Sequence, residues 1–161
     1  MTTGSHDAVT IRLLPALSDS DIEQLADVLV DCVAGGASVS FMHPLARDKA
    51  VGFWRRLADD VADGGRMLLV ARDASGIIGT VQVIAAQPDN QPHRADIAKM
   101  LVHRRARRRG VGSALVRAAE HAARGAGKTL LVLDTATGGD AERLYARLSW
   151  TFVGVIPDYA L

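Results

Sequence analysis

The chain has 161 residues and a formal net charge of +1, and 48% of its residues are hydrophobic while 4% are aromatic. These values fit one globular domain, residues 1–161, whose core is filled by Ala, Val and Leu, and they argue against a general nucleic-acid coat protein. The single cysteine, Cys32, excludes an intrachain disulfide and favours a reducing cytoplasm. No apolar run approaches the roughly 20 residues of a membrane span. Residues 1–7 are polar, are expected to be flexible and do not form a signal peptide.

The first part of the chain predicts one strand and two helices. Alternating apolar residues predict a strand over residues 9–13. Ser18 and Ser20 are both candidate N-caps of the next helix, because an acidic residue stands three positions after each. That helix ends at Gly35-Gly36, and a second amphipathic helix is predicted over residues 45–61.

The middle of the chain predicts a hairpin followed by a crossover. Strands over residues 67–71 and 77–86 flank a turn and are expected to pair antiparallel. A strand over 95–102, a helix over 112–124 and a strand over 129–135 then form a unit whose two strands run parallel. The last of these strands is so apolar that we expect it to be buried on both faces, in the middle of the sheet.

The end of the chain predicts a short helix over residues 140–148 and a final strand over 151–155. The complete order is β-α-α-β-β-β-α-β-α-β. This order predicts an α/β domain with a mixed central sheet flanked by helices.

A basic stretch between strand 95–102 and the following helix points to an anion site. In Arg107-x-x-Gly110-x-Gly112, two glycines let the backbone approach a ligand closely, and the arginines add positive charge. The helix that follows presents unpaired backbone N–H groups and partial positive charge at its start. The motif therefore predicts a phosphate-bearing ligand.

Two other kinds of anion site match parts of the sequence. Gly127-Lys128-Thr129 looks like the end of a P-loop, but Ala122 stands where that motif needs glycine, and a strand rather than a helix follows. We therefore exclude a P-loop nucleotidase. The arginines from Arg104 to Arg109 also allow a nucleic-acid module, although neither an aromatic stacking platform nor a base-reading helix lies nearby.

The motif Arg107-x-x-Gly110-x-Gly112, between a strand and a helix, resembles the acyl-CoA motif of the GNAT superfamily of N-acetyltransferases. The order of elements over residues 9–155 matches the fold of that family as well. Residues 144–154 resemble the family's aromatic-Tyr-x-x-Leu-Gly-Phe-x-x-x-Gly segment, with Leu144 and Ser149-Trp150 as departures. Residues 35–42 and 93–102 also look similar to tabtoxin-resistance acetyltransferases.

The resemblance implies acetyl-CoA as the cofactor. It implies that the backbone of the loop and helix start cradles the CoA pyrophosphate, while Arg107 frames the turn; the residues concerned are Arg107, Arg108, Arg109, Gly110, Val111, Gly112 and Ser113. Arg104 and Arg105 either steer the anionic cofactor, including its 3′-phosphate, or are solvated charges. Leu101 and Val102 end the strand that is expected to pair with the pantetheine arm, where a free backbone N–H would polarise the thioester carbonyl.

The resemblance also places Tyr145 where it would return a proton to the departing CoA thiolate; the alternative is a core tyrosine. Asp96 and Asp134 are expected to face the crevice between adjacent strands. Each is a candidate for the base that takes a proton from the amine, or for a group that binds a cationic substrate. The histidines share no ligand spacing, so we expect no metal.

The implied reaction is direct acetyl transfer to a primary amine in a ternary complex. The resemblance does not identify the acceptor. It is a small molecule such as an antibiotic or toxin, or alternatively a protein lysine or N-terminus; a non-catalytic acyl-CoA sensor is the alternative of another class. We expect Phe41 and Met42 to shape the acceptor pocket, whereas Phe53 packs in the second helix. No nucleic-acid or membrane partner is expected. Relatives continue past Leu161 with another strand, so we expect either a truncated C-terminus or a homodimer that covers the bare sheet edge.

Overall fold

The computed structural model describes residues 8–161, and the expected flexibility of residues 1–7 lies outside that range. The elements in chain order are β1 (Thr10–Leu14), α1 (Asp19–Ala34), α2 (Arg47–Ala62), β2 (Arg66–Asp73), β3 (Gly76–Ala85), β4 (Arg94–Val102), the 3₁₀ turn η1 (Arg104–Ala106), α3 (Val111–Gly125), β5 (Leu130–Val132) and α4 (Asp140–Arg147).

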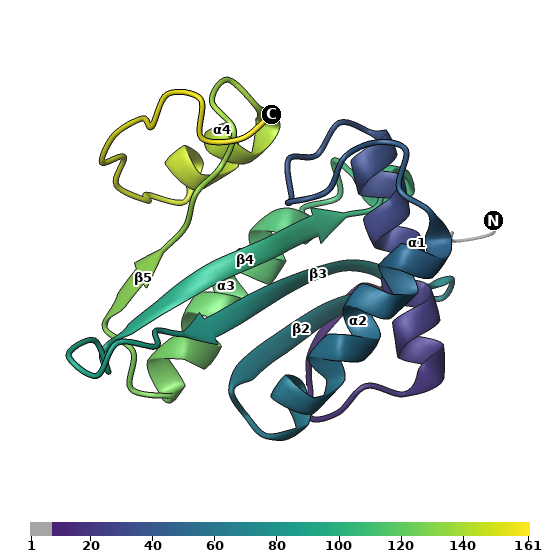
Figure 1. Ribbon diagram of the computed structural model, residues 1–161, viewed down its shortest axis with the longest axis horizontal. Helices are drawn as coiled ribbons and strands as arrows, with labels where there is room; N and C mark the ends of the chain where they lie inside the picture. Colours follow the sequence, from purple (N-terminus) through teal and green to yellow (C-terminus); the bar gives the residue numbers. More distant parts are fainter. Residues whose placement is uncertain (1–7) are drawn as a thin grey trace, which may run out of the picture.

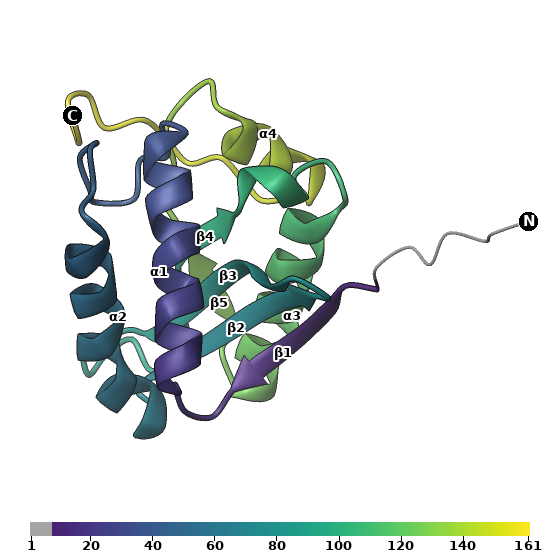
Figure 2. The ribbon, with the colours of Figure 1, turned by 90° about the vertical axis from the view of Figure 1, so that its right-hand side faces the viewer.

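The five strands form one mixed sheet in the order β1-β2-β3-β4-β5. Neighbours from β1 to β4 pair antiparallel, and β5 pairs parallel to β4. Helices α1 and α2 cover one face and α3 covers the other, while α4 stands beyond one end of the sheet (Figures 1 and 2). The predicted α/β domain with a mixed sheet flanked by helices is confirmed.

Each sheet face has its own apolar core, because alternate residues of a strand point to opposite faces. Leu68 and Val70 of β2 pack with the buried Trp54 and Leu29 from α2 and α1. Leu69, between them in sequence, packs with α3 residues on the other face. Contacts on both faces fix the register of the central strands, since a shift by one residue would exchange the two faces.

Helix α1 begins with a complete capping box. The Ser18 hydroxyl accepts from Asp21 N at 3.1 Å, and the Asp21 carboxylate accepts from Ser18 N at 2.9 Å. Ser18 is therefore the N-cap, and Ser20 lies inside the first turn. The bonds also lower the pKa of Asp21 against the opposing effect of its partial burial, with further help from Arg72.

The prediction that strand 129–135 lies buried in the middle of the sheet is wrong. Only residues Leu130–Val132 form β5, at the edge of the sheet, and Leu130 and Val132 are 46% and 39% exposed. An apolar run is compatible with burial on both faces, but burial depends on a further strand beyond it. No such strand occurs in residues 8–161.

The predicted final strand over residues 151–155 is also not formed. Residues 151–161 are exposed throughout and pair with no strand. The element order in the described chain is therefore β-α-α-β-β-β-α-β-α, without the last β. Apolar alternation gives a segment the potential to pair, but a strand forms only where an edge can exchange hydrogen bonds with it. None of the helices in residues 8–161 is both long and apolar enough to cross a membrane.

Candidate active site

The basic loop between β4 and α3 is held in a tight turn that opens the start of α3. Arg108 and Gly110 both have left-handed backbone conformations, with φ of 60° and 73°. Gly110 is the N-cap of α3, and the first helical bond runs from Ala114 N to Gly110 O at 3.0 Å. The N–H groups of Val111, Gly112 and Ser113 precede that bond, so they have no partner within the helix and are available to an anion.

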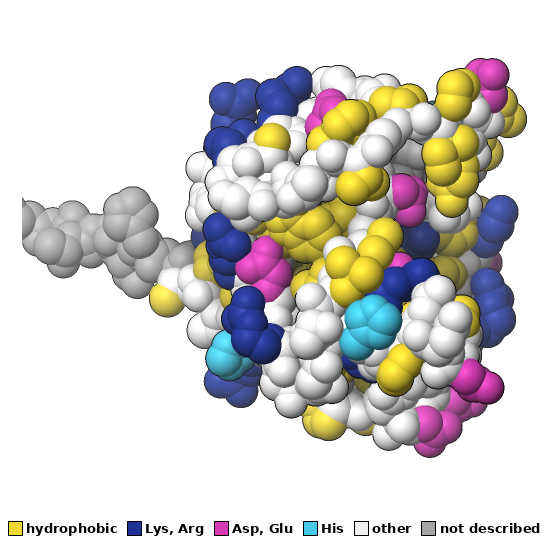
Figure 3. Space-filling model, turned by 90° about the vertical axis from the view of Figure 1, so that its left-hand side faces the viewer, with side chains coloured by type: hydrophobic (Ala, Val, Ile, Leu, Met, Phe, Trp, Pro, Cys, Tyr) yellow, Lys and Arg dark blue, Asp and Glu magenta, His cyan; other side chains and the backbone are white. Residues whose placement is uncertain are grey.

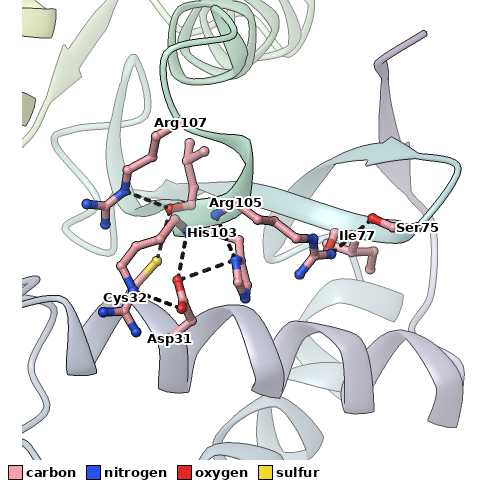
Figure 4. A network of polar contacts seen from close by, with 9 residues as sticks. Asp31, Cys32, Ser75, Ile77, His103, Arg105 and Arg107 are labelled. Atoms are coloured by element: carbon pink, nitrogen blue, oxygen red, sulfur yellow. Dashed lines mark hydrogen bonds and ion pairs between the residues drawn. The ribbon is translucent and has the colours of Figure 1, made fainter. Parts of the chain in front are cut away.

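Several arginines of the loop are engaged with other parts of the chain (Figure 4). Arg104 donates its backbone N–H and its Nε to the carboxylate of Asp31, at 2.8 and 3.0 Å. Arg105 donates to Ile77 O at 3.2 Å, and Arg109 forms an ion pair with Asp73 at 2.9 Å. These contacts tie the loop to α1 and to the β2–β3 hairpin.

Arg107 and Arg108 differ from the other arginines of the loop. Arg107 Nε donates to Val102 O at 3.4 Å, which links the two ends of the turn, and most of its side chain is exposed. Arg108 is exposed and forms no hydrogen bond or ion pair within residues 8–161. These two guanidinium groups, beside the open start of α3, therefore have the capacity to bind phosphate.

Burial and neighbouring charges shift the pKa values of the groups beneath the loop. Burial raises the pKa of the Cys32 thiol to about 11, so Cys32 is protonated at neutral pH; its Sγ lies 3.4 Å from Val102 O. Burial also lowers the pKa of His103, although Asp31 opposes this. Hydrogen bonds from Arg104 outweigh the burial of Asp31 and lower its pKa. Asp31 is therefore an ionised anchor for the loop.

β4 contains a β-bulge, which lies beyond the residues that pair with β5. Thr80 pairs with Leu101 and Gln82 with Ala98, so Lys99 and Met100 together face one residue of β3, and Lys99 has φ of 49°. β5 pairs only with Arg94–Asp96. In Figure 1 the chain then leaves β4 and runs to α4. The edge of β4 that carries Leu101 and Val102 is thus open to an extended ligand.

Tyr145 lies on α4, and its apolar cluster includes Met100 of β4 and Leu133, which follows β5. Its side chain is mostly buried, packs with Leu144 and Val116, and has a ring centroid 5.7 Å from that of Trp150. Trp150 Nε1 is held by Glu120 at 3.0 Å. Burial, with a contribution from the charge of Asp134, raises the pKa of Tyr145 to about 12. Tyr145 therefore carries its proton at neutral pH, as a proton donor must.

The structure separates the two candidate aspartates. Asp134 is exposed, two residues beyond the last paired residue of β5, and its charge acts on both Tyr145 and Lys99. Asp96 lies inside the paired part of β4 and forms an ion pair with Arg94 at 3.3 Å. Asp134 and Tyr145 thus belong to one group of residues, and Asp96 belongs to another.

Sequence reasoning missed the polar residues that line the sheet beside this group. Arg66, Gln82 and Lys99 lie on three neighbouring strands, and Lys99 Nζ is 5.9 Å from the ring centroid of Phe53 and 3.2 Å from Ser40 Oγ. Phe53 in turn packs edge-on against Phe41, at 5.1 Å between centroids. A lysine in the otherwise apolar stretch Ile97–Leu101 was the available signal.

No group of three or more metal-ligating side chains occurs in the part of the chain that the structure describes. The site has three components: an open helix start that carries partial positive charge, an unpaired strand edge, and a protonated tyrosine beside a carboxylate. Such a site can hold an extended, phosphate-bearing ligand and donate a proton to it.

Residues 29–150 match the model of the acetyltransferase (GNAT) family. A transcriptional regulator from Bacillus halodurans C-125 is 30% identical, with a TM-score of 0.71 over 94% of this chain and 100% of that one. The protein yncA from Salmonella typhimurium, solved with its cofactor acetyl-CoA, is 18% identical with a TM-score of 0.76, over 96% of this chain and 86% of that one. An N-acetyltransferase from Staphylococcus aureus Mu50 is 15% identical with a TM-score of 0.74, over 91% and 86%.

Proposed function

Given that this chain belongs to the GNAT family and is an acetyl-CoA-dependent N-acetyltransferase, we propose that it transfers the acetyl group to a primary amine of a small molecule, by direct attack in a ternary complex. The observation that carries this proposal is the position of Tyr145. Its side chain belongs to the same apolar cluster as Met100 of β4 and Leu133, which follows β5, and burial keeps its hydroxyl group protonated at neutral pH.

The residues present fit acetyl-CoA. The N–H groups of Val111–Ser113, together with Arg107, Arg108 and the backbone at Arg109, would hold the pyrophosphate. Gly112 has room for no more than a small group, because a Cβ there would lie 3.2 Å from Leu144 Cδ2. The free edge of β4 at Leu101 and Val102 would hold the pantetheine arm. Acetyl-CoA supplies the activated acetyl thioester.

Residues of this chain then have to accept one proton and donate another. The attacking amine must be neutral, so a proton must leave it, and the exposed carboxylate of Asp134 is well placed to accept that proton or to hold a cationic amine. The departing thiolate needs a proton, and Tyr145 carries one at neutral pH. Asp96 is less suited to either role, because it already pairs with Arg94.

Two alternatives have specific support. Asp134 is exposed, which leaves room for a protein lysine or N-terminus as the acceptor. The 30%-identical Bacillus halodurans protein is described as a transcriptional regulator, so a non-catalytic acyl-CoA sensor is the alternative of another class that the amine screen has to exclude. A sensor would bind acetyl-CoA and release no CoA with any amine.

A screen of amines for CoA release, with acetyl-CoA as donor, tests the proposal. The panel contains small-molecule amines, amino acids and aminoglycosides in one arm and lysine-containing peptides in the other. Turnover of a small amine supports the proposal. Turnover confined to peptides supports the protein alternative, and acetyl-CoA binding without turnover supports the sensor.

We also propose a cytoplasmic homodimer. The buried, reduced thiol of Cys32 fits a reducing compartment. Figure 3 looks at the side of the molecule where β5 lies and shows hydrophobic side chains gathered on that surface. An apolar edge strand is a ready partner for a second copy of the chain.

A further inference from the structure

A strip of polar side chains lies on the sheet face that α1 and α2 cover. Gln82 pairs with Leu68, which is in the core beneath these helices, so Gln82 faces the same side. Arg66 is two residues before Leu68 on β2 and shares that face. Lys99 reaches it through the bulge, since its Nζ contacts Ser40 and Phe53 on the segments that cover this face.

The strip has more hydrogen-bond donors than acceptors. Arg66 donates to Gln82 Oε1, which uses the amide oxygen of Gln82. Arg66 Nε and Gln82 Nε2 are buried and have no hydrogen-bond partner within residues 8–161. Among the ion pairs of residues 8–161, none involves Lys99, and the only hydrogen bond of its Nζ is with Ser40. Unpartnered donors at this density are costly unless a ligand provides the acceptors.

The positive charge of the strip is only partly compensated. The carboxylate nearest to Arg66 is Asp60 at 3.7 Å, whose side chain is 61% exposed while that of Arg66 is 18% exposed. Burial and the charge of Arg66 both lower the pKa of Lys99, and Asp134 only partly opposes them. Two half-buried cations that repel each other would be stabilised by an anion placed between them.

We propose that the acceptor amine also carries an oxyanion group, such as a carboxylate, and that Lys99, supported by Arg66, binds this group. The proposal rests on the proposed function, since it defines the acceptor of the same site. The amine of such a substrate would face Asp134 and Tyr145 while its oxyanion faces Lys99, so that the substrate spans the crevice. Gln82 is a positioning residue, which holds Arg66 through its amide oxygen.

The phosphates of acetyl-CoA are a poor explanation for this charge. Lys99 precedes Val102 by three residues, which is roughly 10 Å along a strand. The anion-binding start of α3 lies further on, beyond η1. The positive charge at Lys99 therefore lies at the part of the crevice near Asp134 and Tyr145, not at the pyrophosphate site.

Matched pairs of acceptors test the inference in the full-length enzyme. L-amino acids are compared with their methyl esters, which lose the negative charge, at equal concentrations of the neutral amine, because esterification also lowers the pKa of the amine. A charge-assisted hydrogen bond contributes enough for kcat/KM to be about 10- to 100-fold higher with the acid than with the ester. Lys99→Met should abolish this preference by raising KM for the acid, and Lys99→Arg should restore part of it.

Lys49→Met is the matched control, because Lys49 Nζ also lies over an aromatic ring, that of Phe41, at 6.0 Å, but on the exposed surface of α2. It should leave the preference unchanged. A second readout without turnover is the shift in Tm that N-acetyl amino acids produce in the presence of CoA, which Lys99→Met should remove.

If esters and acids are equally good substrates, or Lys99→Met raises KM for acetyl-CoA alone, the inference is wrong while the proposed function stands. If no amine in the panel causes CoA release, but N-acetyl amino acids still shift the Tm in a way that depends on Lys99, the proposed function is contradicted and the oxyanion site is retained.

Discussion

In the proposed reaction, the side chain of Tyr145 is both a proton donor and a packing element. Its ring fills space against Trp150, and its raised pKa of about 12 keeps the hydroxyl protonated throughout the neutral range. Tyr145→Phe preserves the ring and removes the proton. We expect kcat to fall about 100-fold or more, the usual contribution of general acid catalysis, while the Kd of acetyl-CoA, measured by calorimetry, stays the same.

The result distinguishes an acid from a core tyrosine. Because the pKa lies near 12, the wild-type rate should not decline at pH 9 through loss of this proton. An unchanged kcat in Tyr145→Phe would mean that water returns the proton and that the role of Tyr145 is packing alone.

Single substitutions should also distinguish the roles of Asp134 and Asp96. Asp134 acts on both Tyr145 and Lys99, whereas Asp96 is paired with Arg94. We therefore expect Asp134→Asn to lower kcat/KM for the acceptor at pH 7 by about tenfold or more, as for loss of a general base, and Asp96→Asn to change it little.

The pH profile of Asp134→Asn identifies its role. If Asp134 is a base, the defect should shrink as the pH rises and the free amine loses its proton unaided. If it holds a cationic amine, the defect should appear in KM and persist over the range in which the amine is charged. A larger defect in Asp96→Asn than in Asp134→Asn would overturn the assignment.

At the scale of elements, the turn before α3 depends on the left-handed conformation of Gly110, with φ of 73°. A Cβ there meets no atom within 4 Å, so the stability cost of Gly110→Ala is backbone strain of about 1 kcal/mol. The methyl group would project beside the open N–H groups of α3. We therefore expect the KM for acetyl-CoA to rise several-fold.

Gly127→Ala, beyond the other end of α3, is the matched control. Gly127 has φ of 78° and equally open surroundings. Urea unfolding should show a similar loss of stability in the two variants, and steady-state kinetics should show a raised KM for acetyl-CoA in Gly110→Ala alone. Equal KM values in both variants would mean that the loop does not approach the cofactor.

The loop also depends on the β2–β3 hairpin through Asp73 and Arg109. Hydrogen bonds from Ser75, then those from Arg109, lower the pKa of Asp73 from 3.8 to about 2 despite burial. A carboxylate whose pKa is lower in the folded state stabilises the fold above its unfolded pKa and loses that contribution as the pH falls. The free energy of unfolding should therefore decline between about pH 4 and pH 2.

Asp73→Asn isolates this contribution. In urea titrations the wild type should be more stable than the variant at pH 6, and the difference should shrink as the pH approaches 2. Asp140→Asn is a useful reference, since Asp140 is fully exposed and pairs only with Arg143 within α4. A difference between wild type and Asp73→Asn that does not change with pH would contradict this role.

Elements specified by local patterns could be predicted from the sequence. The capping box at Ser18 and the helical spacing of α1 and α3 involve residues within four positions of one another. The loop between β4 and α3 could be found for the same reason. The bulge at Lys99 could not, because it arises from unequal numbers of residues on two paired strands.

Features that depend on distant partners were missed. Arg104 and Asp31 are 73 residues apart, and Arg109 and Asp73 are 36 residues apart. Nothing in the sequence near Arg104 indicates that its guanidinium is used within the chain. The position of β5 in the sheet was predicted wrongly for a similar reason. The composition of Leu130–Val132 shows that the strand is apolar but not whether another strand lies beside it.

At the scale of the whole molecule, the apolar surface is concentrated on two segments. Leu130 and Val132 are exposed on the edge strand β5, and Phe152, Val153, Val155 and Ile156 are 59–95% exposed on the segment after α4. Isolated exposed apolar residues are normal, but an unpaired apolar edge strand is not a stable surface in water. We therefore expect a second copy to cover β5.

Val132→Lys tests this arrangement by placing a charge on the β5 edge. Light scattering after gel filtration should give a dimer for the wild type and a monomer for Val132→Lys. Leu13→Lys is the control, because Leu13 is 50% exposed on β1, the strand at the opposite edge of the sheet; it should remain dimeric. The crevice lies beside β5, so the monomeric variant should also lose acetylation rate. A wild type that is monomeric at micromolar concentration and fully active would overturn the dimer.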